Sequence, residues 1–182
     1  MWFYKLLSRN FNNMRFGGNR LMKILDELLS LPKTEEIPDL GLYMDQVITF
    51  MERKYPAKPL TKTMINNYTK DRILFPPVKK KYSREHLMLL SIIQILKRTL
   101  SLPEIKLILG PLSRDLEKNQ FASLYDLYER FFSIYGNVIS IAEETQKKAM
   151  EMSDEKNVRI LSFALLSAYF SSLSEDDLST TP

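Results

Sequence analysis

The chain has 182 residues, enough for one or two small domains with a real hydrophobic core. It has no cysteine and one histidine, His86, which excludes disulfides, zinc–thiolate sites and cysteine nucleophiles and argues against a His-rich metal site or a Ser/His/Asp triad. Its hydrophobic content of 45% with only 5 glycines predicts a globular, mainly all-α protein. We find neither an apolar run of the ~18 residues that a membrane span needs nor a signal-peptide pattern, so we expect a cytoplasmic protein without a membrane partner.

The N-terminal segment, residues 1–36, joins an unusual start to an ordinary helix. Residues 1–21 are aromatic and basic, and three interpretations stay open: a short amphipathic helix, a segment without fixed structure, or a stretch that precedes a native translation start at Met22. Residues 21–31 carry leucine and isoleucine at helical spacing, and Pro32 ends the expected helix.

Two helices separated by a proline-rich turn follow. The first covers residues 42–55, and Pro56 and Pro59 prevent it from continuing. The second begins after an N-cap at Thr61 and runs to about residue 72, with Leu60 and Ile65 spaced as a hydrophobic staple.

The second helix divides into two faces. Met64, Ile65 and Tyr68 fall within one arc of roughly a third of a turn, so we expect them to pack inward. The opposite arc holds only donors, acceptors and positive charge: Lys62, Thr63, Asn66, Asn67 and Lys70. Such side chains suit phosphate oxygens and base edges.

A short basic loop leads into the next two helices. Lys79, Lys80 and Lys81 precede Tyr82, and Ser83 caps a helix that reaches about residue 100, with His86 half-exposed in its first turn. Residues 101–104 form a capping box, and we expect the helix that they open to stop at residues 110–111, Gly-Pro.

The remaining chain, from residue 113, is rich in aromatic residues. Residues 113–152 fit one long helix or two, with Gly136 as a possible break. A last helix should run from Ser153 to about Ser172; its apolar residues cover more than one face, which predicts burial on two sides. Residues 175–182 read as a flexible acidic tail.

Positive charge is concentrated in one segment. Residues 53–84 hold ten Lys or Arg residues and one acid, Asp71, whereas the rest of the chain holds 16 basic and 21 acidic residues. This asymmetry suggests a nucleic-acid footprint. The alternative is an ordinary solvated lysine loop.

The same segment resembles a known family. The stretches "NNYTKDRILFPP", "KKYSREHL" and "SLPEIKLIL" resemble the MerR-type winged helix-turn-helix, and "LYMDQVITFMERK" and "LTKTMINNYTK" resemble the YkrK-like family, a MerR-related domain of unknown function. The resemblance implies a winged helix-turn-helix over residues 37–112, with a wing shorter than MerR wings usually are. It also implies a helical dimerisation or effector region over residues 113–174, although that region has no sustained heptad repeat.

These observations favour a dimeric, sequence-specific transcriptional regulator that binds double-stranded DNA. We expect its contacts to come from the polar helix arc and the basic loop: Lys62, Thr63, Asn66, Asn67, Lys70, Lys79, Lys80, Lys81, Tyr82 and Arg84. The alternative is a protein-interaction module that uses the same scaffold without binding DNA. We expect neither an enzyme, a cofactor nor a metal, because no catalytic constellation is visible. Nothing in the sequence supports a small-molecule effector, although one is possible.

Overall fold

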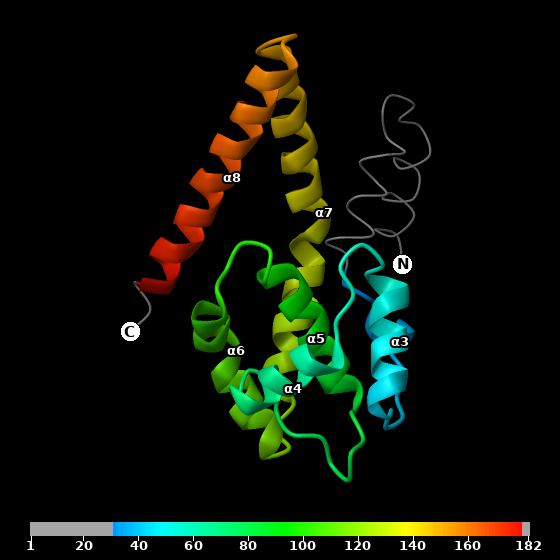
Figure 1. The fold of residues 1–182 in the computed structure, drawn as a ribbon. Helices are drawn as coiled ribbons and strands as arrows, with labels where there is room; N and C mark the ends of the chain where they lie inside the picture. Colours follow the sequence, from blue (N-terminus) through cyan, green and yellow to red (C-terminus); the bar gives the residue numbers. More distant parts are fainter. Residues whose placement is uncertain (1–30, 180–182) are drawn as a thin grey trace, which may run out of the picture.

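The computed structural model describes residues 31–179, and this part of the chain is all-α, as expected (Figure 1). A 3-10 turn, η1 (Thr34–Glu36), precedes six α-helices: α3 (Met44–Lys54), α4 (Lys62–Lys70), α5 (Arg84–Leu96), α6 (Leu102–Glu117), α7 (Ala122–Glu151) and α8 (Lys156–Ser179). Within these residues strand pairing is limited to two isolated bridges, and no helix is long and apolar enough to cross a membrane. The expectations for residues 1–21, and nearly all of the helix expected over residues 21–31, lie outside the described residues.

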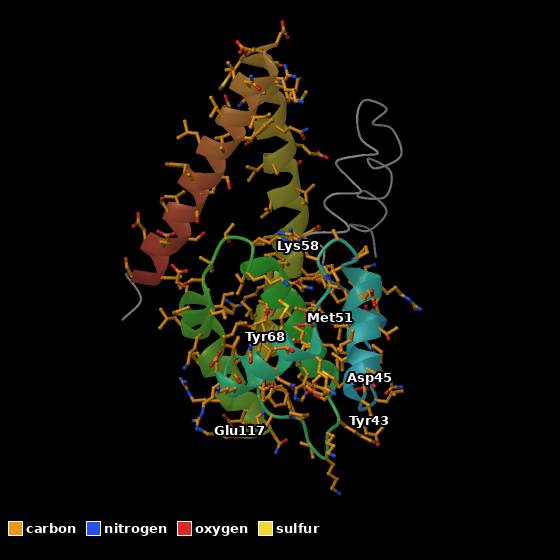
Figure 2. The ribbon with its side chains drawn as sticks, viewed as in Figure 1. Tyr43, Asp45, Met51, Lys58, Tyr68 and Glu117 are labelled. Carbon is orange, nitrogen blue, oxygen red and sulfur yellow. The ribbon has the colours of Figure 1, made fainter. Side chains whose placement is uncertain are left out.

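Helix α5 is the centre of the hydrophobic core. Its residues 87–90 and Ile93 have no exposed surface, α3 and α6 pack against it, and α4 packs against α3 (Figure 1). Figure 2 shows Met51 of α3 and Tyr68 of α4 directed into this interior, where they are 0% and 3% exposed. The core therefore fixes which face of α4 remains on the surface.

The beginning of α7 belongs to the same core. Leu124 and Tyr128 are 0% and 1% exposed. The Tyr128 hydroxyl donates a 2.6 Å hydrogen bond to the carbonyl oxygen of Pro32, and the Tyr125 hydroxyl donates a 2.9 Å bond to Oε1 of Glu85. The core thus extends past residue 112, where we expect the helix-turn-helix to end, and it anchors α7 at its N-terminal end.

Helix α6 corrects the helix stop expected at Gly110–Pro111. The helix continues to Glu117, with Pro111 inside it. Proline removes the N–H that would bond the carbonyl of Leu107, but Leu107 is 65% exposed, so that carbonyl lies on the solvent side. Leu109 and Leu116, two turns apart, are buried on the opposite side, and their packing outweighs the lost hydrogen bond.

Helices α7 and α8 form a hairpin that projects from the core (Figure 1). Helix α7 is continuous through Gly136, and α8 continues to Ser179, into the stretch expected to be a tail. The expectation that the last helix is buried on two sides is wrong for the single chain, because α8 has no buried residue. Eight of its large apolar side chains are each at least 38% exposed: Val158, Ile160, Leu161, Phe163, Leu165, Tyr169, Phe170 and Leu173.

Candidate nucleic-acid interface

Local sequence determines where α4 begins. The side-chain oxygen of Thr61 accepts a 3.2 Å hydrogen bond from the backbone N–H of Met64, as an N-cap does. Leu60 and Ile65, on either side of this cap, are 2% and 0% exposed, which confirms the expected staple. The cap and the staple together fix the angle at which the chain enters the helix.

Packing then separates the two faces of α4. Ile65 and Tyr68 are buried against the core, and Met64 is half-buried. Burial raises the pKa of the Tyr68 hydroxyl, so this group stays protonated and neutral at physiological pH. The whole polar arc is exposed: Lys62, Thr63, Asn66, Asn67 and Lys70. The structure therefore brings these residues together on one accessible face, as the helical spacing predicts.

The basic loop forms a very tight turn. Val78 and Lys81 pair across it, with the Lys81 N–H donating a 2.9 Å bond to the Val78 carbonyl. The two residues between them, Lys79 and Lys80, have φ angles of 50° and 64°. Two successive left-handed residues are typical of a two-residue hairpin turn, in which Asn-Gly is the preferred pair. The turn holds two exposed ammonium groups next to each other at its tip.

The turn is attached to the start of α3. Leu42 and Tyr82 exchange backbone hydrogen bonds of 2.9 and 2.8 Å, and the Lys81 ammonium lies 5.5 Å from the centre of the Tyr43 ring. A Cβ at Gly41 would come within 3.0 Å of the Lys81 Cβ, so glycine permits this close approach. Lys81 is consequently held against α3, whereas Lys79 and Lys80 extend beyond it.

Two of the residues expected at the interface are engaged elsewhere. Tyr82 is 4% exposed because its ring packs edge-on against His86, with centroids 5.2 Å apart, so we remove it from the candidate contacts. Arg84 forms a 3.5 Å ion pair with Asp39, and its side chain is 22% exposed. Its guanidinium is therefore only partly accessible.

His86 is buried, which corrects the half-exposed position expected for it. It is 1% exposed, stacks on the Phe75 ring at 3.7 Å and accepts a 2.9 Å hydrogen bond from the Ser83 N–H at Nδ1. Burial lowers the pKa of its imidazole to about 4. His86 occupies position N3 of the helix, which in a capping box usually holds Glu or Gln. The Ser-x-x-His spacing is therefore the signal from which its capping role could have been inferred.

The exposed cations of this face are electrostatically free. Among residues 31–179, no carboxylate lies within ion-pair distance of Lys62, Lys70, Lys79 or Lys80. Unpaired cations on one face attract anions such as nucleic-acid phosphates. The described residues contain no group of His, Asp and Glu side chains that could hold a metal ion.

One further cation near this face, Arg72, is not among the contact residues expected from the sequence. Arg72 follows the last turn of α4 and adopts φ 59°, a left-handed conformation in which glycine is more common. Its place directly before the buried pair Ile73 and Leu74 marks it as the residue at which the helix turns back to the core. That apolar pair is the signal from which its conformation could have been inferred.

Comparison with known proteins gives a family and nothing further. No curated protein and no solved structure matches the chain. A family profile described as a domain of unknown function, DUF1836, matches residues 32–131. This match begins at the first described residues, contains α3 to α6 and ends in α7 at Phe131, which packs against the core as its neighbour Phe132 does. Because the match covers more than half of the chain, the protein belongs to the DUF1836 family.

Proposed function

We propose that the protein is a sequence-specific regulator of transcription that binds double-stranded DNA through α4, as a dimer, and that its core unit is a MerR-related helix-turn-helix with a very short wing. The observation that carries this proposal is the division of α4. Its apolar residues fill the core, and every polar residue of the opposite arc is exposed and free of acidic partners.

The exposed residues of α4 have two roles in this proposal. Thr63, Asn66 and Asn67 face the major groove, where an asparagine that contacts adenine through two hydrogen bonds contributes roughly 1–3 kcal/mol of discrimination. Lys62 and Lys70 pair with phosphates and provide an affinity that depends on salt but not on sequence. Helix α3 supports α4 from behind, as the first helix of such a motif does.

The conformation of the wing supports a phosphate contact. Lys79 and Lys80 occupy left-handed positions that glycine or asparagine adopts at lower cost, roughly 1–2 kcal/mol per residue. Neither lysine contributes to the core, and both are exposed. Because their presence costs stability, their ammonium groups favour a role outside the fold, namely binding to DNA phosphates.

The exposed surface of α8 supports dimerisation. The charged residues of α8 lie at its ends, with Lys156 and Arg159 at one end and Glu175, Asp176 and Asp177 at the other. Residues 160–174 between them are neutral and carry the stripe Leu161, Leu165 and Tyr169, exposed by 59% or more. An antiparallel pair of α8 helices would place opposite charges together, whereas a parallel pair would place like charges together. A second copy is therefore the best partner for this surface.

Fluorescence anisotropy with duplexes from the protein's own upstream region tests DNA binding, from ~50 to ~200 mM salt. The informative variant combines Lys79→Asn with Lys80→Gly, because Asn-Gly keeps the turn and removes both charges. We expect binding that prefers one sequence and weakens steeply with salt, and a shallower salt dependence in the variant. Lys147→Gln, in α7 and outside the proposed interface, should bind like the original protein. Absence of binding to any duplex at the lowest salt would contradict the proposal.

Light scattering at micromolar concentration tests the dimer. We expect the mass of two chains, and the mass of one chain when Leu161 and Leu165 are both replaced by Glu. Because α8 has no buried residue, these substitutions should leave the helical circular dichroism of the single chain intact. A monomeric original protein would exclude this part of the proposal.

The second candidate is a protein-interaction module. Exposed apolar residues on α7 and α8 favour it, among them Ile134, Val138 and Ile141 of α7. The polar arc of α4 argues against it as the binding surface, because it carries neither an aromatic nor an arginine anchor. If anisotropy finds no duplex that binds, this candidate becomes the better one.

A further inference from the structure

A small cavity lies where the C-terminal end of α4 meets α6. Its volume is about 190 Å³, and its walls include three cations from three different segments: Lys70 of α4, Arg72 from the turn after it and Arg114 of α6. In Figure 2 the labelled Glu117, which also lines the cavity, marks the α6 side. No carboxylate among residues 31–179 forms an ion pair with any of the three cations.

The backbone at Arg72 indicates that its guanidinium has a role outside the fold. The helix ends with the N–H of Ile73 bonded to the carbonyl of Tyr68 at 2.9 Å, which requires a left-handed residue at Arg72. Glycine adopts that conformation without strain, and the exposed arginine side chain contributes no packing in return. Left-handed residues other than glycine cluster at functional sites, and Arg72 also lines the cavity with a cation that forms no ion pair among residues 31–179.

We propose that this cavity seats one phosphate of the DNA backbone, beside the phosphates contacted by Lys62 and the Lys79–Lys80 turn. The inference rests on the proposed function and adds α6 to the binding surface. Guanidinium groups bind phosphate through two parallel hydrogen bonds, and two arginines with one lysine surround the site. Glu117 is the single carboxylate of the lining and opposes the bound phosphate, but the three cations outnumber it.

The position of Lys70 favours the DNA backbone over a free compound as the source of the phosphate. It lies on the exposed arc of α4 and also lines the cavity, so the two surfaces are continuous. A backbone that runs along α4 would reach the cavity at the end of the helix. A free phosphate compound, such as a nucleotide, has the same oxygen chemistry, so the test must separate the two sources.

Salt-dependent anisotropy of two variants tests the site. Arg72→Gly removes the charge and suits the left-handed backbone, and Arg114→Gln removes the second guanidinium from an exposed position. For each we expect an affinity lowered by the same factor on every duplex, and a slope of log affinity against log salt that is shallower by about 0.9 per lost contact. Glu117→Gln should act in the opposite direction and tighten binding.

Asn119→Gly is the matched control. Asn119 is an uncharged residue with φ 60° that follows Lys118, the C-cap of α6, so the variant makes the same kind of backbone change without removing a charge. Its affinity and salt slope should equal those of the original protein. Arg72→Gly should melt at no lower a temperature than the original protein, which separates loss of binding from loss of fold.

The outcomes separate this inference from the proposed function. Suppose that the original protein binds DNA and that the Lys79→Asn/Lys80→Gly variant binds it more weakly. If Arg72→Gly and Arg114→Gln then bind DNA as the original does, only the proposed phosphate site in the cavity is overturned. If ATP binds in a manner that requires Arg72 while duplex affinity does not, the site serves a free phosphate compound and the inference is again overturned. If the original protein binds no duplex, both proposals fail.

Discussion

The core unit of residues 31–132 and the hairpin that follows it bury their apolar residues to opposite extents. In the core unit, α5 alone has eight buried residues, among them His86 and Gln94. In the hairpin, α8 has none, although eight of its large apolar side chains are exposed by 38% or more. The core unit therefore buries its apolar residues within the single chain, whereas most large apolar side chains of α8 remain exposed to solvent.

Apolar composition alone therefore does not identify what covers an apolar surface. The hydrophobic effect favours removal of α8 from water but does not decide whether the same chain or another covers it. Three experiments test the contrast between the core unit and α8, in order of decreasing expected effect.

A matched pair of leucines gives the largest contrast. Leu90 is 0% exposed in α5, and Leu165 is 73% exposed in α8. We expect Leu90→Ala to lower the free energy of unfolding by about 2–5 kcal/mol, because it leaves a cavity in the core. Leu165→Ala should change it by no more than ~0.5 kcal/mol in urea titrations dilute enough to keep the chain monomeric. Equal losses would mean that α8 is buried within the single chain.

The buried His86 in the core unit should make the free energy of unfolding depend on pH. The pKa of His86 is about 4 in the folded chain and about 6.5 when unfolded, so above pH 6.5 the imidazole is neutral in both states. Between pH 6.5 and 4 only the unfolded chain takes up the proton. The free energy of unfolding should therefore fall over this interval, by about 3 kcal/mol at pH 4.

His86→Gln isolates that contribution. Glutamine can still accept the hydrogen bond from the Ser83 N–H at the third capping-box position, but it does not titrate. Chemical unfolding measures the free energy of unfolding of both proteins from pH 7 to 4, and this free energy should fall more steeply for the original protein than for the variant. Parallel declines would assign the acid sensitivity to carboxylates instead.

Charge reversal at the ends of α8 gives the smallest effect and the most specific one. Lys156→Glu or Glu175→Lys alone should weaken the dimer by about 0.2–1 kcal/mol, and the double reversal should restore it, because an antiparallel pair brings the two positions together. Nineteen residues of helix, about 28 Å, separate them within one chain, so they do not interact directly. Sedimentation equilibrium measures the dissociation constants. A double variant weaker than both single variants would exclude the antiparallel arrangement.

Local signals predicted much of the fold and of the candidate interface. The staple of Leu60 and Ile65, the cap at Thr61 and the exposed arc of α4 all follow from spacing within one helix. Such features depend on neighbours three or four residues away, which the sequence displays directly. The short spacing between Pro77 and Tyr82 likewise predicts a short basic loop, but it does not predict the left-handed conformations of Lys79 and Lys80.

The errors arise where distant contacts decide. Pro111 was expected to end a helix, but burial of Leu109 and Leu116 keeps that helix intact. Tyr82 was expected on the surface, but it packs on His86, and His86 itself packs on Phe75. For Pro111 and Tyr82 the outcome depends on which segment covers the residue, and no short-range pattern contains that information, whereas the Ser-x-x-His spacing does indicate the capping role of His86.

Helices α7 and α8 connect the core to their shared turn along two routes. Leu124 and Tyr128 hold the first turns of α7 in the core. Helix α8 returns from the turn to α6, where Leu178 packs against the core and the Ser171 hydroxyl donates a 3.4 Å hydrogen bond to the Thr99 carbonyl. The 30 residues of α7 form a rod of about 45 Å, and a helix held near both ends of such a hairpin resists tilting more than a single helix fixed at one end. If the proposed dimer forms through α8, this bracing would keep the distance between the two α4 helices constant, as half-sites separated by ~34 Å require.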